Sequence, residues 1–274
     1  MNTHDEKKFF FMAGLPRSGW TLLSSILSQN PDIYVSPQST LPNTLGAAYN
    51  QYQSKENEDA NQFDHIYAVM ETIIPTFYSV RPEKYIIDKN FSWLDGHPYV
   101  ILENHLKNDI RVICPVRDVL GILASWNRLC ENDPNNKYDK AISIKYRDKS
   151  SIADKRARYF MELGNKENGI LKGIENLKRV LYPEFKDNIL LVDYDDLTKN
   201  TEVTIGKVYD FLEIPNYAHT YTSLATPHKY EDIWGAKDHH KVKTTIKREE
   251  YDYSSIFSPA TIKQYSGLEF WRNV

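Results

Sequence analysis

The chain has 274 residues, of which 41% are hydrophobic and 26% are charged, as in an ordinary globular protein. Its formal net charge of −3 argues against a broad nucleic-acid-binding surface, because such a surface needs an excess of basic residues. No apolar run approaches the roughly 20 residues of a membrane-spanning helix, so we expect no membrane span. The two cysteines, Cys114 and Cys130, are too few for a disulfide framework, and we expect the protein in the reducing cytoplasm.

Short apolar runs bounded by turn residues predict strands, and helical segments alternate with them. The predicted strands cover residues 9–13, 33–35, 85–87, 110–114 and 189–192. Because these runs do not alternate apolar with polar residues, they are typical of strands covered on both faces, as in a parallel sheet. Apolar residues at helical spacing predict helices around positions 22–27, 119–124 and 203–212, and Pro31 is expected to end the first helix after Asn30.

This order of elements predicts an α/β protein with a doubly wound parallel sheet in three α/β/α layers, folded as a single domain over residues 1–274. Ligands of such a sheet bind beyond the carboxyl ends of its strands. Polar stretches at residues 54–62, 131–151 and 226–250 interrupt the core. We expect the second to be a surface excursion and the third, which includes Lys237 and His239, to be a long loop.

A phosphate-binding loop is predicted directly after the first strand, where the sequence reads Gly-Leu-Pro-Arg-Ser-Gly-Trp-Thr over residues 14–21. Two glycines five residues apart and a threonine before a helix are typical of loops that wrap backbone N–H groups around an anion. ATP- and GTP-binding enzymes place a lysine directly after the second glycine, but Trp20 stands there in this chain. The cation is instead Arg17, inside the loop. An NTPase without its lysine loses the charge that holds the β- and γ-phosphates.

With these features the chain resembles the sulfotransferase family, whose 5′-phosphosulfate loop reads Pro-Lys/Arg-Ser-Gly-Thr-Thr, and the loop is closest to that of tyrosylprotein and bacterial members. The resemblance implies a P-loop-like strand–loop–helix unit that binds 3′-phosphoadenosine 5′-phosphosulfate (PAPS). It further implies transfer of the sulfuryl group to an acceptor hydroxyl, with 3′-phosphoadenosine 5′-phosphate (PAP) as the product and without a metal. The loop residues implied to bind the donor are Pro16, Arg17, Ser18, Gly19, Trp20 and Thr21.

The family's 3′-phosphate motif, an Arg that ends a strand and a Ser eight residues later, is similar to Arg117 and Ser125. A guanidinium can bind a terminal phosphate through two parallel hydrogen bonds. Asp118 is well placed to cap the helix that follows. Weaker resemblances imply that Tyr194 lies near the adenine, and that Lys241 and Lys243, in the late basic stretch, close over the nucleotide.

Sulfuryl transfer develops charge on the bridging and sulfuryl oxygens, so positioned cations are its main catalytic device. The resemblance implies Arg17 and Lys89 for this role. The acceptor hydroxyl also needs a proton acceptor, yet Phe91 and Gln38 occupy the two positions where family members carry a basic His or Glu. Three explanations stay open: a base from elsewhere in the fold, an acceptor acidic enough to need little help, or a slow or inactive enzyme. The candidates for a base from elsewhere are Asp88, Asp95, His65 and His97.

Two other functions are compatible with the sequence. A P-loop-like kinase or NTPase is favoured by the glycine spacing and opposed by Trp20. A non-catalytic nucleotide-binding module on the same fold is favoured by Phe91 and Gln38. The acceptor, whether a small molecule, a carbohydrate or a peptide, is not readable from the sequence, because acceptor pockets are built from variable loops. The oligomeric state is equally open.

Overall fold

A parallel sheet forms the centre of the protein in the computed structural model, which describes residues 7–106, 110–162, 169–226 and 240–273. The described residues form a sheet of five strands in the order β2-β3-β1-β4-β5, with every neighbouring pair parallel. The strands are β1 (Lys8–Met12), β2 (Ile33–Gln38), β3 (Tyr85–Lys89), β4 (Val112–Val116) and β5 (Ile189–Asp193). The predicted α/β fold with a parallel sheet is therefore confirmed.

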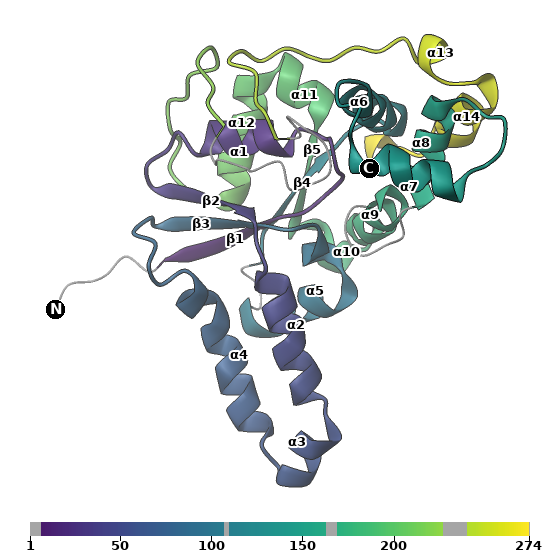
Figure 1. Ribbon diagram of the computed structural model, residues 1–274. Helices are drawn as coiled ribbons and strands as arrows, with labels where there is room; N and C mark the ends of the chain where they lie inside the picture. Colours follow the sequence, from purple (N-terminus) through teal and green to yellow (C-terminus); the bar gives the residue numbers. More distant parts are fainter. Residues whose placement is uncertain (1–6, 107–109, 163–168, 227–239, 274) are drawn as a thin grey trace.

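Two hydrophobic clusters cover the two faces of the sheet, because successive side chains of a strand point in opposite directions. Phe10 and Ile87 belong to one cluster, with α1 (Trp20–Leu27), α11 (Tyr194–Lys199) and α12 (Thr201–Leu212) above it. Phe11 and Ile86 belong to the other. That second face is covered by α5 (Gly96–Leu106), α6 (Val119–Glu131), α8 (Ile152–Glu162) and α9 (Ile170–Leu177). Figure 1 shows these three layers, as the sequence predicts.

The remaining helices lie at the margins of this core. An arm formed by α2 (Leu41–Tyr52), α3 (Lys55–Ala60) and α4 (Phe63–Phe77) projects away from the sheet (Figure 1). The other short helices are α7 (Lys137–Lys145), α10 (Pro183–Lys186), α13 (Tyr253–Ile256) and α14 (Pro259–Tyr265), and 3₁₀ turns cover Phe91–Leu94, Lys178–Leu181 and Phe270–Asn273. None of the described helices has both the length and the apolarity to cross a bilayer.

Several boundaries differ from the sequence predictions. The strand predicted at residues 110–114 lies two residues later, because its pairing with β5 continues from Val112 to Val116. The first helix ends at Leu27 rather than at Asn30, whose side chain instead bonds the hydroxyl of Tyr209. The predicted surface excursion at residues 131–151 includes α7, whose Ile142 is fully buried. Lys237 and His239 lie outside the described residues.

Candidate active site

A cavity of about 850 Å³ opens at the carboxyl ends of the strands, where ligands of such sheets bind. Its size lies within the range of pockets for small ligands and cofactors. Most of the site residues expected from the sequence line it, namely Pro16, Arg17, Gly19, Trp20, Thr21, Lys89, Arg117, Ser125, Tyr194, Lys241 and Lys243. Of the remaining expected residues, Ser18 lies buried beneath the loop and Asp88 does not line the cavity. Residues that are far apart in the sequence therefore meet in one place.

The phosphate loop turns sharply between β1 and α1. Gly14 has φ 125°, and a Cβ atom there would lie 2.5 Å from the carbonyl oxygen of Pro115, so this close passage beside β4 requires glycine. Gly19, at φ 94°, is the residue before α1. The hydroxyl of Ser18 is within hydrogen-bonding distance of the carbonyl oxygen of Pro115, at 2.8 Å, which ties the loop to the end of β4. The loop is thus fixed by backbone contacts beneath it.

Arg17 points from this loop toward α6. Its φ of 57° is an uncommon conformation for a residue other than glycine, and such strained residues cluster at ligand-binding sites. The Arg17 Nε donates a hydrogen bond of 3.1 Å to the hydroxyl of Ser125, so the two predicted phosphate motifs are in direct contact. Burial lowers the pKa of Arg17 below its usual value, and the nearby charge of Arg117 acts in the same direction. Two arginines this close favour an anion between or beside them.

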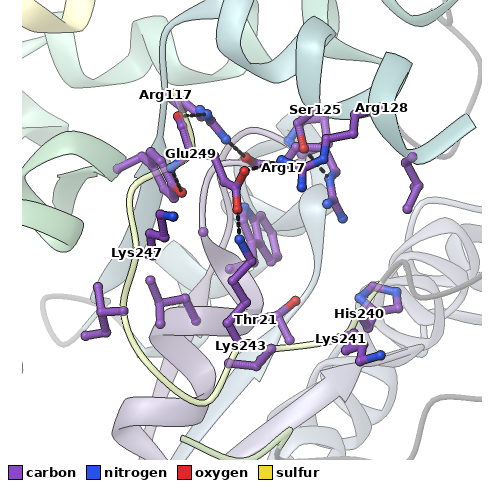
Figure 2. A pocket seen from close by; sticks show the side chains of 18 of the residues that line it. Arg17, Thr21, Arg117, Ser125, Arg128, His240, Lys241, Lys243, Lys247 and Glu249 are labelled. Carbon is purple, nitrogen blue, oxygen red and sulfur yellow. Dashed lines mark hydrogen bonds and ion pairs between the residues drawn. The ribbon is translucent and has the colours of Figure 1, made fainter. Parts of the chain in front are cut away.

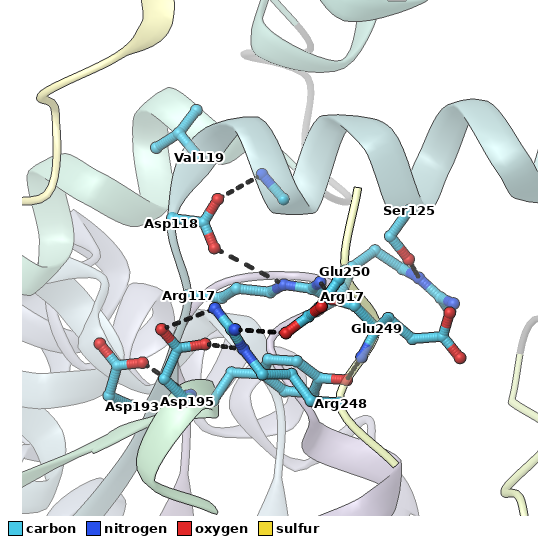
Figure 3. A network of polar contacts seen from close by, with 12 residues as sticks. Arg17, Arg117, Asp118, Val119, Ser125, Asp193, Asp195, Arg248, Glu249 and Glu250 are labelled. Carbon is cyan, nitrogen blue, oxygen red and sulfur yellow. Dashed lines mark hydrogen bonds and ion pairs between the residues drawn. The ribbon is translucent and has the colours of Figure 1, made fainter. Parts of the chain in front are cut away.

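Arg117 is the first residue after β4 and is only 3% exposed. Its guanidinium lies 4.0 Å from the centre of the Tyr194 ring and donates to the carbonyl oxygens of Arg17, at 3.4 Å, and Glu249, at 3.2 Å. Asp118 caps α6 as predicted, accepting a hydrogen bond of 2.6 Å from the Gly121 N–H, and its carboxylate lies 3.9 Å from the Arg117 Nε (Figure 3). The guanidinium is therefore held in one orientation before any ligand binds.

Lys89, the last residue of β3, lines the cavity and pairs with Met12 and Gln38, the last residues of β1 and β2. It is 4% exposed, and burial lowers the pKa of its ammonium group to about 8. Gln38 is its pairing partner on β2, and both line the cavity. The rings of Trp20 and Phe91 lie 4.4 Å apart between their centroids and form an aromatic wall of the same cavity.

A late segment, residues 240–251, covers the cavity and contributes Lys241 and Lys243 to it (Figure 2). The Glu249 carboxylate of this segment forms ion pairs with Lys243 and with Arg128 of α6. Burial alone would raise the pKa of Glu249, but hydrogen bonds and charge from Lys243 and Arg128 bring it below its usual value. The Glu249 N–H donates to the hydroxyl of Tyr194 at 3.2 Å. This segment therefore links α6 to α11.

Three of the four sequence candidates for a catalytic base, Asp88, Asp95 and His65, do not line this cavity. Asp88 points to the opposite face of the sheet from Lys89, where its carboxylate accepts hydrogen bonds from Tyr78, Ser39 and Trp93. Burial raises the pKa of Asp88. Asp95 binds Lys172 and Asn176, and His65 lies exposed on α4. The side chain of His97 lies outside the described part of the chain.

Sequence reasoning missed three groups that line the cavity. Arg128 follows Ser125 by one helical turn on α6, so the spacing of three residues could have revealed it. Glu249 and the imidazole of His240 carry no such signal, because their segment crosses the cavity only through the tertiary fold. The sequence assigned His240 to a basic loop without a chemical role.

The parallel sheet, the strand–loop–helix unit at residues 8–27 and the helices on both faces define an α/β protein of three layers. The comparisons with known proteins agree: a family model described as a sulfotransferase domain matches residues 7–226, so the chain belongs to the sulfotransferase family and is a transferase. The alternative kinase or NTPase function is not favoured, in keeping with Trp20 at the position of the NTPase lysine.

Solved structures are similar over nearly the whole chain. The sulfotransferase domain of the Synechococcus PCC 7002 olefin synthase is 20% identical, with a TM-score of 0.52 over 99% of this chain and 97% of that one. Mouse sulfotransferase SULT7A1, solved in complex with PAP, is 11% identical, with a TM-score of 0.53 over 99% of this chain and 86% of that one. These likenesses establish the fold. Among curated proteins no significant match was found.

Proposed function

We propose that the sulfuryl donor of this sulfotransferase is PAPS, bound across the cavity between the phosphate loop and the end of β4. Arg17 and the backbone of Pro16, Ser18 and Gly19 would hold the 5′-phosphosulfate, with Thr21 adding a hydroxyl and Trp20 a wall. The single observation that carries the proposal is that Arg17, Arg117 and Ser125 line one cavity and that Arg17 contacts both of the others. PAPS is anionic at both ends of its ribose, which matches two arginines on separate elements.

Arg117 and Ser125 are assigned to the 3′-phosphate. Arg117 is buried against Tyr194, whose ring is then available to lie beside the adenine. Lys241 and Lys243 come from the covering segment and would contact the nucleotide from its open side. Together with Arg17, these assignments use basic groups from three different parts of the chain, which is typical of a site for a multiply charged anion.

Arg17 and Lys89 are assigned to catalysis. In an in-line displacement at sulfur, negative charge develops on the bridging and sulfuryl oxygens as the bond to the leaving phosphate breaks. Two cations fixed in a water-poor cavity stabilise that charge more strongly than they stabilise the ground state. Both side chains line the cavity, and Lys89 is almost fully buried. Asp88 belongs to the opposite face and is not included in this set.

The proposal also covers the acceptor, the metal requirement, the domain organisation and the location of the protein. The acceptor is a hydroxyl compound, either a small molecule, a carbohydrate or a peptide, and no step needs a metal. A single domain over residues 1–274 is supported by the sheet and by the clusters on its faces. A reducing cytoplasmic location is supported by Cys114 and Cys130, which are both free and buried.

The decisive test compares the effect of one substitution on PAP, which carries the 3′-phosphate, and on adenosine 5′-phosphosulfate, which lacks it. Arg117→Ala is expected to weaken PAP binding by about 1.5–3 kcal/mol, the range for hydrogen bonds to charged groups. Binding of adenosine 5′-phosphosulfate, which lacks that phosphate, is expected to change little. Isothermal titration calorimetry measures both. Arg111→Ala is the matched control, because Arg111 lies at the opposite end of the same strand and pairs with Glu213. Equal losses for both nucleotides would falsify the 3′-phosphate assignment.

A further inference from the structure

The cavity contains few groups that can take a proton from an acceptor hydroxyl. Among its described lining residues, one carries an imidazole, His240, and one carries a carboxylate, Glu249. Phe91 and Gln38, which also line the cavity, cannot act as bases at neutral pH. The choice among the described carboxylates and imidazoles therefore reduces to His240 and Glu249.

Glu249 is poorly suited to this task. Its carboxylate is already bound to Lys243 and Arg128, and those two cations hold its pKa below the usual range. Adding a proton would break two ion pairs inside the cavity. A group stabilised as an anion in this way is a weak proton acceptor.

His240 differs from Glu249 because the basic form of an imidazole is neutral, whereas that of Glu249 is an anion bound by two cations. His240 lies at the start of the described covering segment, and Figure 2 shows it beside Lys241, on the side of the cavity away from Arg117. Burial lowers the pKa of its imidazole to about 4, and the charges of Lys89 and Arg17 act in the same direction. The imidazole is thus neutral at physiological pH, and it lies close enough to both proposed catalytic cations to feel their charge.

We propose that His240 takes the proton from the hydroxyl group of the sulfuryl acceptor, because Phe91 and Gln38 stand at the family's base positions and cannot take it. This inference rests on the proposed function and extends it. In the step, the acceptor oxygen forms a bond to sulfur while the bond from sulfur to the bridging phosphate oxygen breaks. The electron pair of the broken bond stays on the phosphate of PAP, and the hydroxyl proton moves to the neutral imidazole. His240 is therefore a catalytic residue that contacts the acceptor.

The donor itself would adjust the strength of this base. Lys89 of β3, Arg17 of the phosphate loop and the neighbouring Lys241 are the cations on the elements around His240. A bound phosphosulfate offsets their charge, so the imidazole is a stronger base in the loaded enzyme than in the free one. Proton transfer is then favoured after the donor has bound.

The test uses two phenols as probe acceptors with the full chain. Phenol must lose its proton during transfer, whereas 4-nitrophenol is largely ionised at mildly alkaline pH and needs little help. His240→Gln keeps a polar side chain but removes the base. We expect it to lower turnover of phenol by about 100-fold or more, and that of 4-nitrophenol by less than about tenfold. PAP affinity, measured by calorimetry, is expected to stay within about threefold of wild type.

His219→Gln is the matched control, because His219 is also a half-buried histidine but bonds Tyr209 instead of lining the cavity. We expect no change in its turnover. Imidazole in the buffer is expected to restore part of the phenol activity of His240→Ala. Equal losses for the two phenols, or unchanged turnover of phenol, would overturn the assignment of His240.

A measurement without any acceptor separates this inference from the proposed function. The imidazole signals of His240, assigned by comparison with His240→Gln, are followed by NMR against pH in the free and PAP-bound protein. We expect the pKa to rise on PAP binding, and an unchanged pKa would overturn the inference. Failure of the wild-type protein to bind PAP would overturn the proposed function instead, and the role of His240 with it.

Discussion

The two halves of the sheet contribute to the cavity in different ways. The β4–β5 half supplies Arg117 and Tyr194 at strand ends, packed against each other, and β4 leads into the helix that carries Ser125. The β2–β3 half supplies Gln38 and Lys89 as the last residues of its strands. The phosphate loop follows β1, which lies between these halves, and its Arg17 contacts the β4–β5 side.

The difference between the halves follows what each is proposed to bind. The β4–β5 half, which is proposed to bind the nucleotide, resembles the family's 3′-phosphate motif in residue type and spacing. The β2–β3 half keeps its lysine but carries Gln38 and Phe91 at the family's base positions. A site whose hydroxyl substrate differs between enzymes can use a different residue to take the proton, provided that another element brings such a residue within reach. The cavity therefore combines a half that keeps the family's motif with a half that departs from the family's base positions.

The largest expected effect tests whether the β2–β3 half contributes to the chemical step of sulfuryl transfer. Lys89→Ala is expected to lower turnover by about 100-fold or more, because it removes a buried cation that stabilises developing charge. PAP affinity is expected to fall far less. Lys84→Ala, at the start of the same strand region and outside the cavity, is the control. Single-turnover kinetics and calorimetry separate the two effects, and unchanged turnover removes Lys89 from the catalytic set.

The pH dependence of the reaction rate also tests whether Lys89 of the β2–β3 half is catalytic. The Lys89 ammonium, with its pKa of about 8, is charged below that pH and neutral above it. The rate at limiting donor should therefore fall as the pH rises through about 8, and Lys89→Arg, which stays charged, should move this fall to higher pH. A profile that is identical in the two enzymes contradicts the assignment.

A smaller effect is expected in the β4–β5 half from Gly121→Ala. A Cβ atom at residue 121 would lie 2.6 Å from the Asp118 carboxylate and 2.9 Å from the Arg117 Nε. The guanidinium must shift, so we expect PAP affinity to fall by about tenfold and stability to fall by about 1–3 kcal/mol, as for overpacking. Calorimetry and thermal denaturation measure these changes. Gly206→Ala, where an added Cβ meets nothing within 4 Å, is the matched control on another helix.

The smallest expected effect concerns Glu249, whose carboxylate places a negative charge in a cavity proposed to bind an anion. Glu249→Gln is expected to tighten PAP binding by about threefold to tenfold, because Lys243 and Arg128 are released to interact with phosphate. Glu250→Gln is the control, since Glu250 pairs with Arg248 and its side chain is 76% exposed. Weaker binding by Glu249→Gln would show instead that the carboxylate mainly holds the covering segment in place.

Much of the fold is predictable from local pattern. Unbroken apolar runs predicted the strands because both faces of a parallel sheet are buried. The arm of α2, α3 and α4 was not predicted, although α4 carries apolar residues at helical spacing, namely Phe63, Ile66, Met70, Ile73 and Phe77, so local pattern could have revealed that helix. The shift of β4 by two residues reflects pairing with β5, a contact that no local pattern contains.

For the candidate site, the sequence by itself determined the phosphate loop, Arg117 with Ser125, and the position of Lys89, because each is a short motif at the end of a strand. Only the tertiary structure decided which side of the sheet each strand-end side chain faces, and so separated Lys89 from Asp88. It also brought His240 and Glu249 into one cavity with Arg17, Arg117 and Ser125, which lie more than a hundred residues earlier in the chain. Such long-range contacts depend on how loops cross the packed core, and local residue patterns do not encode that path.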